Sequence, residues 1–276
     1  MMMYDLVATD FDMTLKPPAG EIGPRTMGAI ARIRDLGVHF TVVSGRTTAG
    51  LIHNLTSQGF DLEEMYVISY NGAAVAEAST GRQLVSRTIG RDVAAAILGH
   101  ARAFQVEMIV PEGEYVYTEW AEPIVAGYEA RSNATTLQQV PDLALLGIEP
   151  HKILIGGEAD LLRTAAAEIA APFRDVAEFS FSAPFMLEVT AKNVDKGTAF
   201  ADMCAALGID RSRTIAFGDN HNDIPMIRQA GLGVAVANAV PELKEVADRV
   251  TAACDEEGLA DVLDELFPVR APGPHV

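Results

Sequence analysis

Short apolar segments alternate with segments of helical periodicity along most of the chain. "YDLVA", "VHFTVVS", "MYVIS", "TIAFG" and "GVAV" have the composition of buried strands, and helical patterns such as "PRTMGAIARIRDLG" and "KGTAFADMCAALG" lie between them. Strands that are apolar along their whole length are typical of a parallel sheet that is covered by helices on both faces. The alternation therefore predicts an α/β fold with a doubly wound, mostly parallel sheet.

The middle of the chain follows a different pattern. "AAVAEASTGRQLVSRTI" indicates a hairpin with its turn near Thr80 and Gly81, and the strands and helices after it lack the regular alternation of the flanking regions. We expect an α+β module to be inserted into the parallel-sheet domain, with boundaries near residues 83 and 185. The core would then comprise residues 1–82 and 186–276, and the inserted module residues 83–185.

The composition excludes some classes of function. Of the 276 residues, 49% are hydrophobic and 21% are charged, which suits a globular protein with a large buried core. The formal net charge of −17 argues against a nucleic-acid partner, because phosphate backbones need a basic surface. An anionic substrate would be repelled by the same global charge, so its site would need local positive charge or a metal ion.

The N-terminal segment does not have the pattern of a signal peptide. "MMMYDLVATD" has no basic segment before an apolar one, as a signal peptide would, and no window approaches the 18 or so apolar residues that span a membrane. Cys204 and Cys254 fit buried apolar positions better than a disulfide. We expect a cytoplasmic protein without a membrane partner, whose last residues, "PVRAPGPHV", form a loose tail.

Polar residues gather where the predicted strands end. In a doubly wound sheet, ligands bind beyond the carboxyl ends of the strands. The residues at these ends are Asp10, Asp12 and Thr14 after the first strand, Ser44, Gly45 and Arg46 after the second, and Asp219, Asn222 and Asp223 after "TIAFG"; Lys196 lies in the first turn of a helix. Each group alone has a simpler explanation as a solvated turn, a helix cap or an exposed lysine. Their coincidence at one sheet edge favours a functional site.

The acidic residues suit a magnesium ion. Two carboxylates that are two residues apart on an extended segment face the same way, which is unfavourable without a cation or a reaction that needs them. Mg²⁺ prefers hard oxygen ligands. We expect Asp10 and Asp219 to bind it directly, with a backbone carbonyl from Asp12 and support from Asp223.

The same residues could transfer a phosphoryl group. A carboxylate such as Asp10 can attack phosphorus, while Asp12 protonates the leaving oxygen and later activates water. Ser44 can donate hydrogen bonds to phosphoryl oxygens, and Lys196 adds a compact positive charge. The pattern therefore predicts phosphate chemistry on a small metabolite.

These motifs together resemble those of the haloacid dehalogenase superfamily of phosphatases, and most closely its Cof-type branch. The matching segments, in order, are "DFDMT", "VVSGR", "NVDKG" and "GDNHND", with "YNGA" at Asn71 and "AGLGVAVANAVPELKEVADRVT" as further landmarks. The resemblance covers nearly the whole chain. It implies a Rossmann-like core with an α/β cap inserted between the second and third motifs.

The resemblance also implies residue roles. Residues assigned to the substrate are Thr14, Ser44, Gly45, Arg46, Asn71 and Asn222; to catalysis Asp10, Asp12 and Lys196; and to the metal Asp10, Asp12, Asp219 and Asp223. One position departs from the pattern, because Met13 stands where most relatives carry glycine. We interpret Met13 as a tolerated residue in an ordinary turn that crowds the cap side of the site.

We expect a magnesium-dependent phosphatase of small phosphorylated metabolites, sugar phosphates above all, that forms an aspartyl-phosphate. The alternatives are a phosphomutase or a phosphatase dedicated to one sugar phosphate. A third alternative is a non-enzymatic receiver module phosphorylated on Asp10, which also combines acids, a hydroxyl and a lysine on a parallel sheet. Receivers are much shorter and have no inserted module.

Overall fold

The computed structural model describes residues 4–268, so most of the expected tail lies outside the described residues. The chain divides into two compact units. The first comprises Met1–Ser44, Leu62–Tyr66 and Lys196–Val276, and the second Gly45–Asp61 and Val67–Asp195. This division assigns segment 45–61 to the second unit by its contacts. The domain boundaries near residues 83 and 185 remain a prediction.

The first unit contains a parallel sheet. Its strands pair in the order β14-β13-β12-β1-β2, and each of these neighbouring pairs is parallel. Their bounds are Leu6–Asp10 (β1), His39–Val43 (β2), Thr214–Gly218 (β12), Leu232–Ala235 (β13) and Arg249–Val250 (β14). Every residue of β1 and β12 is buried, as expected for strands that are covered on both faces. The predicted parallel α/β core is confirmed.

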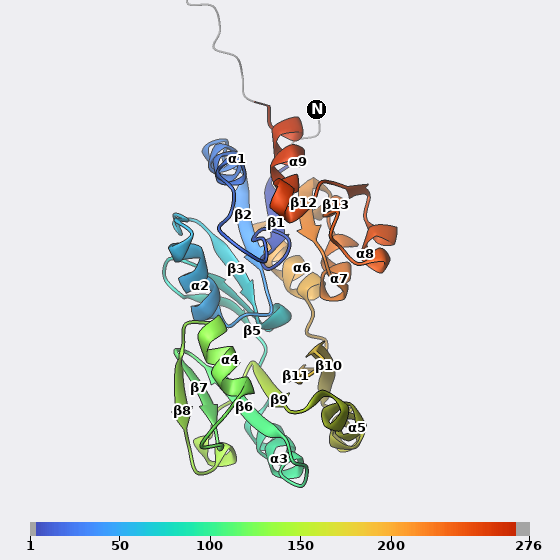
Figure 1. The fold of residues 1–276 in the computed structure, drawn as a ribbon. Coiled ribbons are helices and arrows are strands. Elements are labelled where there is room, and N and C mark those ends of the chain that lie inside the picture. Colours follow the sequence, from blue (N-terminus) through green and yellow to red (C-terminus); the bar gives the residue numbers. More distant parts are fainter. Residues whose placement is uncertain (1–3, 269–276) are drawn as a thin grey trace, which may run out of the picture. The chain divides into compact units, whose positions relative to one another are not determined.

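Helices of the first unit alternate with its strands along the chain (Figure 1). Their bounds are Pro24–Asp35 (α1), Lys196–Leu207 (α6), Ile224–Ile227 (α7), Pro241–Val246 (α8) and Gly258–Leu266 (α9). Helix α1 begins at a proline, which has no amide hydrogen to leave unpaired in a first turn, and packs beside α9. Helix α7 is shorter than the sequence pattern predicts, because a separate 3₁₀ turn, His221–Asp223, replaces its beginning.

The second unit contains a six-stranded sheet in the order β10-β11-β9-β6-β7-β8, antiparallel except for the parallel pair β7–β8. Its strands are Glu107–Glu112 (β6), Tyr115–Thr118 (β7), Thr136–Gln139 (β8), Lys152–Gly156 (β9), Ala177–Ala183 (β10) and Met186–Ala191 (β11). The sequence pattern did not predict β8, whose four residues are all exposed and carry no apolar periodicity. The mixed sheet confirms the α+β character of the middle region.

Alternation along the strands gives this sheet two buried faces. Met108 and Val110 of β6 belong to one apolar cluster with helices α3 (Arg91–Ala101) and α5 (Ala159–Ala170), whereas Ile109 between them belongs to another with α4 (Val125–Ser132). Successive residues of a strand point to opposite faces, so α4 lies across the sheet from α3 and α5. The remaining elements are α2 (Thr48–Ser57), β3 (Tyr66–Ser69) and the hairpin β4 (Ala74–Glu77) and β5 (Gln83–Ser86).

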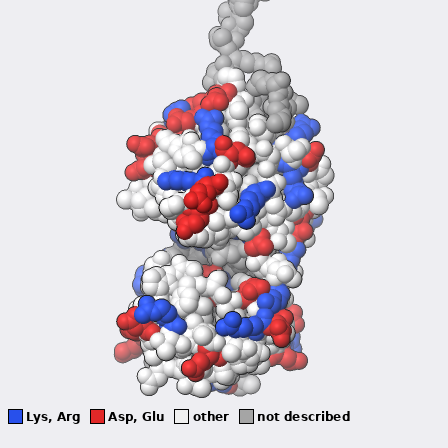
Figure 2. Space-filling view, turned by 90° about the vertical axis from the view of Figure 1, so that its right-hand side faces the viewer, with Lys and Arg blue, Asp and Glu red and all other residues white. Residues whose placement is uncertain are grey.

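The surface mixes charges of both signs. On the face drawn in Figure 2, basic and acidic side chains alternate over each unit, without one broad basic surface. Among residues 4–268, no helix is both long enough and apolar enough to cross a membrane.

Candidate active site

The strand register of the first unit brings three predicted site residues to one sheet edge. Asp10, the last residue of β1, pairs in register with Val43 of β2, and Thr9 pairs with Phe217 of β12. Ser44 and Asp219 are the residues that follow these two neighbouring strands. Both therefore emerge beside Asp10, at the carboxyl end of the sheet where open α/β folds bind ligands.

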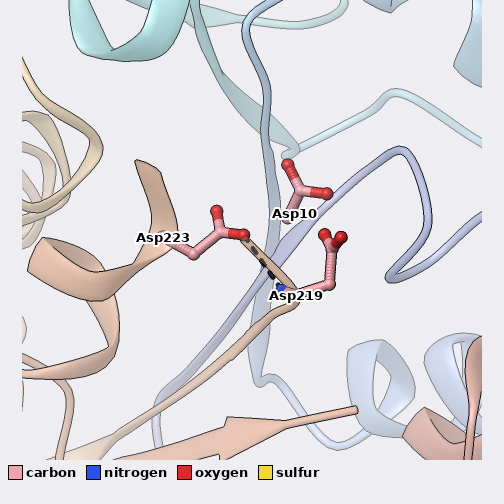
Figure 3. A group of neighbouring side chains, drawn as sticks. All are labelled: Asp10, Asp219 and Asp223. Atoms are coloured by element: carbon pink, nitrogen blue, oxygen red, sulfur yellow. Dashed lines mark hydrogen bonds between the residues drawn. The ribbon is translucent and has the colours of Figure 1, made fainter. Parts of the chain in front are cut away.

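Three carboxylates converge at this edge. Asp10, Asp219 and Asp223 each offer an oxygen, and these oxygens all lie within 4.8 Å of one another (Figure 3). Asp223 Oδ2 accepts hydrogen bonds from the backbone amides of Asp219 and Asn220, both at 3.0 Å, which fixes the loop after β12. Gly218 makes this approach possible, since a Cβ there would lie 2.5 Å from Cβ of Asp223.

Lys196 joins two of these carboxylates. Its ammonium lies 2.5 Å from Asp10 Oδ1 and 2.6 Å from Asp223 Oδ1, and its side chain is fully buried. An unpaired buried ammonium would be strongly unfavourable, so the two carboxylates are needed to hold it there. Lys196 opens α6, and its position at a helix start brings it to the sheet edge from a segment far away in sequence.

Burial and crowding determine the ionisation of the group. Burial raises the pKa of Asp10 well above its ordinary value, Lys196 lowers it in part, and Asp223 and Asp219 raise it further. Burial and the charge of Asp223 raise the pKa of Asp219 to about 6. Burial lowers the pKa of Lys196, but Asp10 and Asp223 more than offset this, so it is raised. A cation among the carboxylates would favour their ionised forms.

The loop after β1 has a demanding backbone. Thr14 is buried and its hydroxyl donates to Asp219 Oδ1 at 2.9 Å. Met13 has φ 67°, in the left-handed region that favours glycine, so our expectation of an ordinary turn is wrong. Asn238 Nδ2 donates to the carbonyl of Met13 at 2.8 Å, and Asn238 Oδ1 accepts from the amide of Cys254 at 3.0 Å. Asn238 thereby ties this loop to the segment after β13.

Asn238 was missed as a candidate, although it follows β13 at the same sheet edge. The rule that selected residues after the other strands would have found it.

Two of the predicted site residues are exposed, namely Asp12 and Asn222. The carboxylate of Asp12 lies outside the group of three carboxylates. Asp12 is thus exposed, whereas Asp10, two residues before it, is buried.

The other predicted substrate residues belong to the second unit. Gly45 and Arg46 start that unit immediately after Ser44, and Asn71 follows β3. Asn71 has φ 55° and donates from Nδ2 to Glu188 Oε2 at 2.9 Å. The Arg46 guanidinium donates to the carbonyl of Ser132. The first unit thus brings together Asp10, Thr14, Ser44, Lys196, Asp219 and Asp223.

This arrangement combines the parts that phosphoryl transfer needs. The three carboxylates form a donor set of hard oxygens that fits Mg²⁺. One of them, Asp10, is also held by a buried ammonium, which orients it and lowers the cost of its negative charge. A carboxylate next to fixed positive charge can act as a nucleophile toward phosphorus.

Comparison with known proteins agrees with this chemistry. The profile of the family described as haloacid dehalogenase-like hydrolase matches residues 7–263. A 5-amino-6-(5-phospho-D-ribitylamino)uracil phosphatase of Bacillus subtilis is 28% identical, over 95% of this chain and 97% of its own. An HMP-PP phosphatase of Serratia proteamaculans is also 28% identical, over 95% and 94%. The crystal structure of a haloacid dehalogenase-like hydrolase from Bacteroides thetaiotaomicron superposes with a TM-score of 0.89 at 27% identity, covering 96% of this chain and all of that one.

Proposed function

The chain belongs to the haloacid dehalogenase-like hydrolase family and is a phosphoric monoester hydrolase, and on this premise we propose its substrate class and mechanism. It is a magnesium-dependent phosphatase of small phosphorylated metabolites, sugar phosphates above all, that forms an aspartyl-phosphate on Asp10. The observation that carries the proposal is the buried group in which Lys196 bridges Asp10 and Asp223 beside Asp219.

Asp10 is the nucleophile in this proposal. Its carboxylate attacks the phosphorus atom, a P–O bond forms on Asp10, and the bond between phosphorus and the leaving alkoxide breaks. Asp12 gives the alkoxide a proton, and the ionised Asp12 then removes a proton from the water that hydrolyses the phosphoryl-enzyme. Phosphate leaves, and both carboxyl groups return to their starting states.

Other residues hold the phosphoryl group during this exchange. Ser44 follows β2 beside Asp10, and in this proposal its hydroxyl donates a hydrogen bond to a phosphoryl oxygen. Thr14 orients Asp219 through its hydrogen bond of 2.9 Å. Lys196 orients Asp10 and offsets its negative charge, and because both side chains are buried this attraction is stronger than it would be in water.

The metal ion would be held by Asp10, Asp219 and Asp223 together with the carbonyl of Asp12. These are oxygen donors of the kind that Mg²⁺ prefers, and they are crowded enough to need a cation. When bound, the ion supplies positive charge for the phosphoryl oxygens, which a chain with a net charge of −17 otherwise provides sparingly.

The inserted module is proposed to select the substrate. Two relatives are named as phosphatases of small molecules, and the molecule named for one of them contains a phosphorylated ribityl group. These names support a small metabolite as the substrate here. Replacement of the predicted module, residues 83–185, by a short linker should raise relative activity on bulky synthetic phosphates. It should lower activity on the preferred metabolite, and an unchanged selectivity profile would contradict this role.

Phosphate release from p-nitrophenyl phosphate and from a panel of sugar phosphates tests the proposal. Activity should disappear with EDTA and return with magnesium, whereas calcium should replace it poorly because its larger, looser shell misplaces the phosphoryl group. Asp10→Asn should abolish turnover, and Asp5→Asn, which alters a carboxylate paired with Arg213 instead, should not. Full activity after exhaustive chelation, or a near-native rate for Asp10→Asn, would refute the mechanism. Interconversion of a phosphorylated sugar without phosphate release would assign a mutase.

A further inference from the structure

A second group of buried charges lies in the second unit. Lys152, the first residue of β9, has its ammonium 3.0 Å from Glu129 Oε1 and 3.8 Å from Glu188 Oε1. The three side chains are only 3%, 6% and 6% exposed. Burial lowers the pKa of Lys152, and the two carboxylates more than offset this. Removing charges from water is costly, so such a group calls for an explanation beyond packing.

The ammonium of Lys152 also reaches the segment after Ser44. It donates to the carbonyl of Gly45 at 3.1 Å. The Arg46 carbonyl accepts from the amide of Tyr70 at 2.8 Å, and the Arg46 guanidinium donates to the carbonyl of Ser132. Residues 45 and 46 are therefore held by β9, by the turn after β3 and by the end of α4.

Asn133 holds the next residue. Asn133 is 2% exposed, and its Oδ1 accepts hydrogen bonds from the amide of Thr47 at 3.1 Å and from Oγ1 of Thr47 at 3.3 Å. Its Nδ2 donates to the carbonyl of Glu129 at 3.0 Å, which fixes the amide orientation. Gly50 leaves room for this side chain, because a Cβ there would lie 2.3 Å from Asn133 Oδ1.

We propose that Asn133 and Lys152 are positioning residues that hold residues 45–47 and, through them, set the orientation of Ser44. Ser44 and Gly45 share one planar peptide unit, so anchoring residues 45–47 restricts the torsions that aim the Ser44 side chain. The proposal rests on the proposed function, in which Ser44 donates to a phosphoryl oxygen. It predicts that the second unit affects phosphate binding itself, whatever the leaving group.

A double-mutant cycle tests the proposal. Affinity for orthovanadate, a phosphate-like anion, is measured by calorimetry for Ser44→Ala, Asn133→Ala and the double variant. Ser44→Ala should weaken binding roughly 10–100-fold, the loss of one hydrogen bond to a charged group. Asn133→Ala should weaken it by a similar or smaller factor, and the double variant should bind no more weakly than Ser44→Ala alone. If the affinity loss of the double variant equals the product of the two single losses, the proposal is overturned.

Leu162→Ala supplies the structural control. Leu162 is fully buried in the apolar cluster of α3 and α5, to which residues 45–47 do not belong, so its truncation should destabilise the second unit. It should lower the melting temperature and leave orthovanadate affinity unchanged. Equal loss of affinity in Leu162→Ala and Asn133→Ala would show that Asn133 acts only through stability and would overturn the proposal.

A second pair of variants applies if Asn133→Ala does not fold. Gly50→Ala places a methyl group against the Asn133 amide, whereas Gly99→Ala, in α3 of the same unit, meets nothing within 4 Å. Both add a better helix former. Only Gly50→Ala should weaken orthovanadate binding and lower kcat/KM for p-nitrophenyl phosphate and sugar phosphates by one common factor. Unequal factors would indicate recognition of the leaving group and refute the proposal.

The readouts separate this inference from the proposed function. Orthovanadate affinity needs no turnover, so the cycle is decisive even for a chain that hydrolyses none of the phosphates offered. Turnover of p-nitrophenyl phosphate by the wild type, lost in Asp10→Asn, supports the proposed function whatever the cycle shows. Wild-type turnover combined with multiplicative losses in the cycle would refute only the positioning role.

Discussion

Replacement of Lys196 by methionine separates the structural role of this lysine from the catalytic role proposed for it. The substitution keeps a long apolar stem and removes the charge that lies 2.5 Å from Asp10 and 2.6 Å from Asp223. Breaking a buried ion pair costs about 3–5 kcal/mol, because the partner stays buried without compensation. At about 2–4 °C per kcal/mol, the melting temperature should fall by roughly 6–20 °C in the absence of metal.

The loss should depend on pH in a defined direction. Without Lys196, Asp10 keeps the influences that raise its pKa, namely burial and the neighbouring carboxylates. A carboxyl group whose pKa is higher in the folded than in the unfolded state contributes stability below its folded pKa and loses it as pH rises. The difference in unfolding free energy between wild type and Lys196→Met should therefore increase as pH rises.

The assay is urea unfolding in EDTA, followed by circular dichroism, for Lys196→Met, Asp223→Asn and the double variant. The side-chain amide that Asp223→Asn introduces can still accept the backbone hydrogen bonds that Asp223 Oδ2 receives from Asp219 and Asn220. The double variant should lose about 0.5–3 kcal/mol less unfolding free energy than the sum of the two single losses. It should not regain activity. The buried-charge argument would be refuted by losses of unfolding free energy that are strictly additive. It would also be refuted if the loss in Lys196→Met became smaller as pH rises.

Three further outcomes are expected. Asp12→Asn should slow sugar-phosphate hydrolysis by about 10²–10⁴-fold and spare the first step with p-nitrophenyl phosphate, giving a burst of p-nitrophenolate; equal losses without a burst would assign Asp12 to the metal. Met13→Gly should raise the unfolding free energy by about 0.5–1 kcal/mol, since glycine relieves a residue at φ 67° at some entropic cost, and urea titration would expose the opposite sign. Burial lowers the pKa of His151, so the unfolding free energy should decrease as pH decreases through the range where histidine of the unfolded chain titrates. His151→Gln should remove part of this pH dependence, which thermal melts at several pH values would measure.

Local patterns along the chain were sufficient to predict the class of the fold and the sheet edge that carries the site. Continuous apolar strands such as "TIAFG" have few alternatives to a covered parallel sheet, and the carboxyl-end rule then selects Asp10, Ser44 and Asp219. These two inferences need only local composition and a general geometric rule, so they can be made without knowing which residues contact one another in the fold. The motif order added the family, which the match over residues 7–263 confirms.

Some residues gained a role only from contacts across long sequence distances. Lys196 and Asp10 are 186 positions apart, and only the folded first unit shows that one buried ammonium bridges Asp10 and Asp223. Asn238 and Met13 are 225 positions apart, and their hydrogen bond has no counterpart in local pattern.

Folding also distinguishes residues that a spacing pattern treats alike. The spacing predicts that the side chains of Asp10 and Asp12 face the same way, yet Asp10 is buried within the group of carboxylates and Asp12 is exposed outside it. It assigns Met13 to an ordinary turn, whereas the backbone there is left-handed. It places Lys152 and Asn133 among unremarked polar residues. Charge, backbone torsion and burial are set by neighbours that folding brings together, and no window of sequence contains those neighbours.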